Sequence, residues 1–254
     1  RGTQIAREAA AMVLRDDAFS TIVVAIREGR VILRNIQRFV AYLLSCNLSE
    51  VLIVSIAIVS GLALPLLPLQ ILFLNLVTDV FPAFALGAGA GDAGVLDRPP
   101  RDPSKPIITR SLWRQIVFHG LLITGATLGA MEIAAAVFHV RGEEVLTISF
   151  LTLAFAQLWN VFNMRDPRSP MLRNDVTRNP YIWSMLALCT GLLLIAVYTP
   201  SLARILMLTP PTAPEWGLIL AMSFAPVIVG QAAKEIVRVN FMRRRRKRIK
   251  EDSR

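Results

Sequence analysis

The sequence predicts an all-α membrane protein with six transmembrane helices, and three observations support this fold class. Of the 254 residues, 54% are hydrophobic, and the mean hydropathy is +0.52. The apolar residues gather in blocks of about 20, which is the length a helix needs to cross a bilayer core of about 30 Å. Lysine and arginine concentrate in alternate connections between these blocks. A soluble all-α protein is the alternative, but six such blocks in one chain are hard to bury without a membrane.

Six blocks meet the length requirement. They cover approximately residues 40–61, 68–88, 115–138, 146–164, 181–200 and 215–237. The first two are joined by a tight, uncharged connection, whereas residues 89–114 form a polar, proline-rich loop. Its Pro-Pro and Asp-Pro pairs favour an extended backbone over a helix.

The distribution of positive charge predicts the orientation of the chain. All but two of the 28 lysines and arginines, Arg141 and Arg204, lie in the segments 1–38, 96–114, 165–179 and 234–254. Cytoplasmic loops carry such an excess of basic residues, so we expect both termini in the cytoplasm and an even number of spans. The basic tail then contacts membrane lipids with anionic headgroups, and we expect no nucleic-acid partner.

Residues 1–38 are too polar to enter a membrane and too few to form a core of their own. We expect a short helix, a strand at residues 11–14, a turn at Asp16 and Asp17, and then an amphipathic helix. Nothing ends that last helix before the apolar block at Val40, so it should continue into the first span as one rod. The predicted domains are 1–38, the end of a cytoplasmic domain with its stalk; 39–238, the membrane domain; and 239–254, the basic tail.

Polar side chains interrupt the first two spans. Asn47 and Glu50 are spaced i, i+3, and Asn75, Thr78 and Asp79 are spaced i, i+3, i+4, so each set projects from one helix face. A carboxylate in the middle of a span costs about 2.5–3.5 kcal/mol on insertion scales and usually marks a function. The alternative, that these groups only hold helices together, explains the amides and hydroxyl well but the two carboxylates poorly.

Facing one another, the two helices would offer a cage of oxygen ligands. Hard cations such as Ca²⁺ prefer six to eight oxygens, whereas the soft ligands that favour copper or zinc are absent apart from Cys46. Pro82 lacks a backbone donor and should break the second helix, which frees carbonyl groups for the site.

Polar residues of the later spans are weaker candidates. Gln157, Asn160 and Asn163 on the fourth span could complete the cage or join helices. Glu132 on the third span is a possible ligand or proton carrier, and His119 is expected at the membrane interface.

These residues fall within longer motifs that resemble a known family. The motifs are AREAAAMVLRDD (6–17), IREGRVILRNIQRFVAYLLSCNLSE (26–50), LPLQILFLNLVTDVFPAFALG (67–87) and DRPPRDPSKPIIT (97–109). In this order they resemble the C-terminal part of type II P-type cation-transporting ATPases, the calcium-pump type. The resemblance implies that the spans are helices 5 to 10 of such a pump, in a bacterial-type plasma membrane. It also implies that residues 1–38 are an α/β remnant of the phosphorylation domain.

The resemblance assigns cation ligands to Asn47, Glu50, Asn75, Thr78 and Asp79. It implies that the phosphorylated aspartate, the sites for ATP and Mg²⁺ and the fourth-helix ligands belong to an N-terminal part that would precede Arg1. The eighth-helix glutamate of two-site pumps aligns with Met164, which predicts one Ca²⁺ per cycle. Two alternatives remain open: a truncated remnant or non-catalytic membrane subunit, and a Na⁺ or H⁺ pump of the same superfamily.

Overall fold

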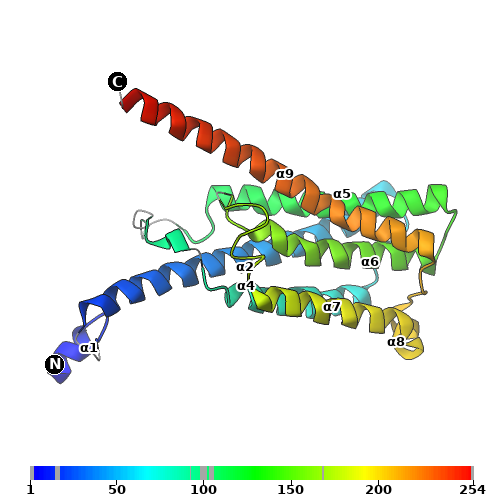
Figure 1. Ribbon diagram of the computed structural model, residues 1–254. Helices are drawn as coiled ribbons and strands as arrows, with labels where there is room; N and C mark the ends of the chain where they lie inside the picture. Colours follow the sequence, from blue (N-terminus) through cyan, green and yellow to red (C-terminus); the bar gives the residue numbers. More distant parts are fainter. Residues whose placement is uncertain are drawn as a thin grey trace.

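The computed structural model describes residues 3–14, 18–91, 93–97, 102, 106–167 and 169–252, with side chains up to Val239. All regular elements in these ranges are helices, and six of them are long and apolar enough to span a membrane. This confirms the six predicted spans. Figure 1 shows an elongated bundle in which both chain ends project from the same end.

The elements follow one another with short connections on the side away from the termini. They are α1 (Gln4–Ala9), α2 (Phe19–Ser60), α3 (Pro68–Leu74), the π-helix η1 (Asn75–Asp79), α4 (Val80–Gly87), the 3₁₀ turn η2 (Ala93–Val95), α5 (Arg110–Val137), α6 (Glu143–Asn160), the 3₁₀ segment η3 (Val161–Met164), α7 (Pro180–Tyr198), α8 (Pro200–Leu206) and α9 (Ala213–Asp252). The second span consists of α3, η1 and α4 together.

Helix α2 is the predicted rod. Its 42 residues run without interruption from the polar N-terminal segment through the first span. Gly61 ends it in the left-handed conformation at φ 68°, and the Leu62 amide donates to the Ala57 carbonyl at 2.9 Å. Glycine suits this position because it has no Cβ to clash in that conformation.

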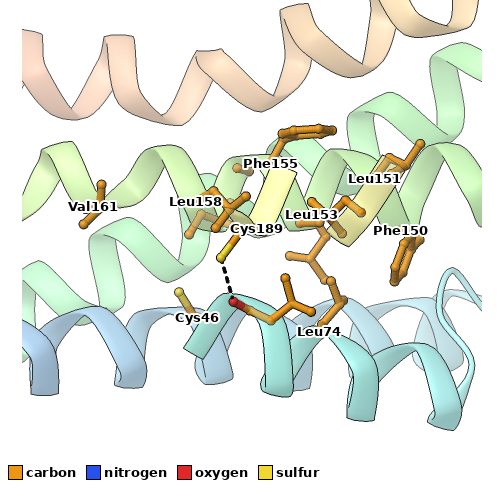
Figure 2. Packing of buried hydrophobic residues seen from close by; sticks show 14 of the residues in the cluster. Cys46, Leu74, Phe150, Leu151, Leu153, Phe155, Leu158, Val161 and Cys189 are labelled. Atoms are coloured by element: carbon orange, nitrogen blue, oxygen red, sulfur yellow. Dashed lines mark hydrogen bonds between the residues drawn. The ribbon is translucent and has the colours of Figure 1, made fainter. Parts of the chain in front are cut away.

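Helix α6 is the centre of the bundle. In its most apolar stretch 78% of the residues are buried, compared with 28–44% in the other five spans. It packs against α5 and α9 along its length and against α7 on another side. Figure 2 shows Phe150, Leu153 and Leu158 of α6 in the core, which also contains Leu74 and Cys189. The Cys189 thiol donates to the Val77 carbonyl at 3.2 Å, which fastens α7 to η1.

The outer surface of the bundle is apolar. Large side chains such as Val59, Leu72, Phe84 and Ile228 are mostly exposed, although they belong to the most hydrophobic residue types. A soluble protein would bury these residues, whereas a lipid-facing surface needs them.

The N-terminal segment differs from the prediction. Residues 11–14 are irregular, and the described residues contain no strand, so the expected α/β remnant is not present in this part of the chain. The residue types favour a strand, but an isolated strand has no partner for its backbone hydrogen bonds. The turn predicted at Asp16 and Asp17 lies outside the described residues.

Candidate cation site

The polar groups of the first two spans meet at the C-terminal half of α2. Asn47 and Glu50 of α2 face η1, which carries Asn75, Thr78 and Asp79, and Gln157 of α6 reaches between the two. The structure therefore brings together the two sets that the helical spacing placed on single faces. Within the described residues, no three His, Cys, Asp or Glu side chains form one group. The site thus consists of two carboxylates and neutral amide and hydroxyl groups.

The helix irregularity predicted at Pro82 occurs one turn earlier. The chain stays helical through Pro82, and the disturbance is the π-helix η1 at Asn75–Asp79. Pro82 has no N–H and so cannot donate to the carbonyl of Thr78, its partner in an α-helix, or of Val77, its partner in a π-helix. The helix is therefore irregular in the turn that precedes Pro82. Side chains bind these two carbonyls instead. The Tyr42 hydroxyl donates to Thr78 at 2.6 Å, and the Cys189 thiol donates to Val77.

Gln157 joins the two halves of the site. Its Nε2 donates to Glu50 Oε1 at 2.9 Å, and its Oε1 lies 2.7 Å from the Thr78 hydroxyl. All three side chains are buried. Because one amide bonds to both partners, Gln157 fixes the carboxylate of α2 and the hydroxyl of η1 relative to each other.

The second carboxylate lies at the open side of the site. Asn47 is exposed on α2, and its Nδ2 donates to Asp79 Oδ2 at 2.9 Å. The other carboxylate oxygen of Asp79 and the amide oxygen of Asn75 are both buried and have no hydrogen-bond partner in the described part of the chain. Burying an unpaired polar oxygen is costly, so the site contains oxygens suited to a positively charged ligand.

The other candidates do not join this group. Asn160 donates to the Ser45 hydroxyl of α2 at 3.0 Å, and Asn163 accepts from Gln231 of α9 at 3.2 Å, so both connect helices nearer the end that carries the termini. Glu132 is exposed and lines a separate cleft with Arg141 at the opposite end. His119 is buried in α5, and its Nδ1 has no hydrogen-bond partner among the described residues.

Met164 also lies away from the group around Glu50 and Asp79, although it is expected to align with an eighth-helix ligand. It lines a cleft with Arg34 and Arg38 near the termini, whereas Gln157 is the α6 residue that contacts Glu50. The alignment of Met164 with a ligand position therefore does not fit the geometry.

Sequence reasoning missed a second buried polar cluster, at the end of α6. Its core is Arg165, whose Nε donates to Gln231 at 2.6 Å and whose guanidinium pairs with Glu235 at 2.9 Å. The Lys234 ammonium donates to the carbonyls of Asn163 and Arg165. Both cations had been counted with the solvated charges of the connections. No pattern in the sequence separates buried cations near a helix end from exposed ones.

Comparison with known proteins identifies the family. A sequence profile described as "Cation transporting ATPase, C-terminus" matches residues 63–236, which is more than half of the chain. The chain belongs to the P-type cation-transporting ATPase family, and it corresponds to the C-terminal part.

Two relatives in this family are named as calcium-transporting ATPases. The chain is 40% identical over 231 residues to a calcium-transporting ATPase of Bacillus subtilis, which covers 90% of the chain and 26% of the relative. It is 34% identical over 249 residues to calcium-transporting ATPase 1 of Bacillus cereus, covering 92% and 28%. The chain thus spans about a quarter of the length of these relatives, which extend well beyond the membrane helices described above.

Proposed function

We propose that this chain is the cation-binding and translocating membrane module of an ATP-driven pump, and that Ca²⁺ is its transported substrate. One observation carries the proposal: Glu50 and Asp79 converge from two helices with Asn75, Thr78 and Gln157, and two of the oxygens have no partner in the described chain. The names of the two relatives support Ca²⁺ as the ion.

The donor set favours a hard divalent cation. Two carboxylates balance a charge of two, and amide and hydroxyl oxygens supply further ligands without adding negative charge. Gln157 would orient Glu50 and Thr78 in the bound state or contribute its own oxygen. On the return step, Glu50 and Asp79 would take up protons in place of the ion.

The open side at Asn47 and Asp79 is the place for ligands from outside the described helices. We assign these ligands to the fourth helix of the complete pump, whose upstream domains would also bind ATP and Mg²⁺ and carry the phosphorylated aspartate. Both termini would then lie in the cytoplasm of a bacterial-type cell. The continuous helix α2 would transmit movement of the phosphorylation domain to Glu50.

Asp79→Asn in the ATP-driven pump that contains this chain tests the proposal. The substitution keeps the shape and removes the charge, so Ca²⁺-dependent phosphorylation by ATP should be abolished. Glu132→Gln is the control, because it removes an exposed carboxylate of the membrane domain and should leave the Ca²⁺ dependence unchanged. Normal Ca²⁺ dependence in Asp79→Asn would refute the proposed site.

A further inference from the structure

A cleft with an excess of positive charge lies at the end of the bundle that carries the termini. It has a volume of about 620 Å³, within the range of small-molecule sites. Its walls come from α2, the segment after α4, and the connection between η3 and α7. Three arginines line it: Arg27, Arg173 and Arg178.

The cleft has a rigid wall. In the connection before α7, Asn174 Oδ1 accepts from the amides of Val176 and Thr177 at 2.9 and 3.0 Å, and its Nδ2 donates to the Met171 carbonyl at 2.8 Å. Asn179 Nδ2 donates to the Ala85 carbonyl at 2.8 Å, which ties the connection to α4. The backbone that carries Arg173 and Arg178 is therefore fixed by side-chain bonds and does not need a ligand to form.

Charge within the cleft is only partly balanced. Arg27 pairs with its neighbour Glu28 at 3.0 Å, and both side chains are about half exposed. The carboxylate of Asp175, which also lines the cleft, pairs with Arg38. Arg173 and Arg178 are exposed and have no ion-pair partner among the described residues. The cleft thus presents two uncompensated guanidinium groups, which suit a phosphate with its several acceptor oxygens.

Apolar side chains continue from the cleft toward the lipid-facing surface. Tyr181, which lines the cleft on the first turn of α7, is 61% exposed. Leu172, next to Arg173 in the chain, is 81% exposed, and Trp183 of α7 is 53% exposed. The Trp183 indole donates to the Thr177 carbonyl at 2.9 Å, so its ring is held in place. Exposed tyrosine and tryptophan at a helix end are typical of the level of the lipid headgroups.

We propose that this cleft binds the phosphate headgroup of an anionic phospholipid, with its acyl chains leaving past Tyr181 along the lipid-facing side of α7. Arginines and the apolar surface beside them match the two ends of one lipid molecule. A free phosphate ion would use the arginines alone. Basic clefts between helices at a membrane surface commonly recognise acidic headgroups. The inference depends on the membrane location of the helices and not on the cation site.

Native mass spectrometry of the full chain in detergent tests the proposal. Dioctanoyl-phosphatidylglycerol, dioctanoyl-phosphatidylcholine and inorganic phosphate are titrated separately and in competition. We expect the first phosphatidylglycerol to bind about tenfold or more tightly than phosphatidylcholine, because each basic residue near a membrane surface adds roughly fivefold. The double variant Arg173→Gln/Arg178→Gln should reduce this preference to within about twofold, and thermal unfolding shows whether it remains folded.

Arg110→Gln/Arg114→Gln is the matched control. It removes two exposed arginines from the start of α5, which do not line the cleft, and should retain the preference. An unchanged preference in the cleft variant, or an equal loss in the control, would overturn the proposal. Displacement of phosphatidylglycerol by inorganic phosphate at equal concentration would also overturn it, since the ligand would then be free phosphate.

Discussion

Two polar clusters lie along the fourth span, one at Gln157 of α6 and one at its end beyond η3, and they differ in how their charged groups are paired. The cluster around Gln157 combines two carboxylates with amides and leaves oxygens of Asn75 and Asp79 without partners in the described chain. The cluster around Arg165 contains two buried cations, whose donors meet Gln231, Glu235 and backbone carbonyls.

This difference indicates different roles. A buried cluster whose bonds are complete stabilises one arrangement of the helices, and nothing in it calls for a further ligand. Unpaired oxygens in a site with two negative groups are costly unless a cation binds there. We therefore assign a structural role to the Arg165 cluster and ion binding to the Glu50 and Asp79 cluster.

The largest effect on stability is expected from Arg165→Met. The substitution removes the guanidinium from Gln231 Oε1 and Glu235 Oε1, while Glu235 still pairs with Arg238. We expect a cost of about 3 kcal/mol, because each lost hydrogen bond to a charged group costs about 1.5–3 kcal/mol. Thermal unfolding in detergent measures the loss. Arg238→Met is the control, since Arg238 pairs with the same Glu235 at 3.2 Å but in a partly exposed position. Its cost should be at most about 1 kcal/mol. Equal losses in the two variants would argue against a buried, structural Arg165.

A smaller loss of stability is expected from Gly230→Ala, which tests the contact between α9 and the end of α6. An added Cβ would lie 2.7 Å from the Asn163 Oδ1. The Asn163 amide must then leave its bonds with Asn160 and Gln231, or the helices must separate, at a cost of about 1–3 kcal/mol. Gly217→Ala, in the same helix, meets nothing within 4 Å and should be neutral or stabilise the protein by up to about 1 kcal/mol. Similar unfolding temperatures for the two variants would show that the close contact is not required.

Gln157→Ala should moderately lower both the stability of the protein and its Ca²⁺ affinity. Glu50 and Thr78 lose their shared partner, and we expect the Ca²⁺ affinity of the complete pump to fall about tenfold, which corresponds to the roughly 1–1.5 kcal/mol of a typical hydrogen bond. The Ca²⁺ dependence of phosphorylation by ATP measures it. Ser149→Ala, on the same helix but without a described partner for its hydroxyl, should leave the affinity unchanged. An unaltered affinity in Gln157→Ala would limit Gln157 to joining helices.

The sequence predicts the spans well because their length and apolar character follow directly from the bilayer. It also predicts α2 as one rod, since no residue up to Val40 ends the helix. The face-to-face meeting of Glu50 and Asp79 follows from helical spacing once the two helices are adjacent.

Other features depend on how the helices pack against one another, which the spacing of residues along the sequence does not determine. Gln157 and Asn160 are one turn apart on α6 and both contact α2, but Gln157 meets Glu50 whereas Asn160 meets Ser45. The burial of Arg165 and Lys234 is unpredicted for the same reason, because it depends on how α9 packs against the segment that follows α6. At Pro82, residue type predicts a disturbed helix, but the neighbouring Tyr42 and Cys189 accommodate it as a π-helix one turn earlier.

Equilibrium binding of radioactive Ca²⁺ to the complete pump, in its wild-type form and with Glu50→Gln or Asn160→Ala, tests the assignment of the two clusters most directly. Both side chains are buried and take part in a hydrogen bond between α2 and α6. Only Glu50 belongs to the cluster with unpaired oxygens. We predict that Glu50→Gln weakens Ca²⁺ binding by about a hundredfold or more, as expected for the loss of a charged ligand at about 3 kcal/mol, while Asn160→Ala retains wild-type affinity. Wild-type binding by Glu50→Gln, or an equal loss in both variants, would contradict the assignment.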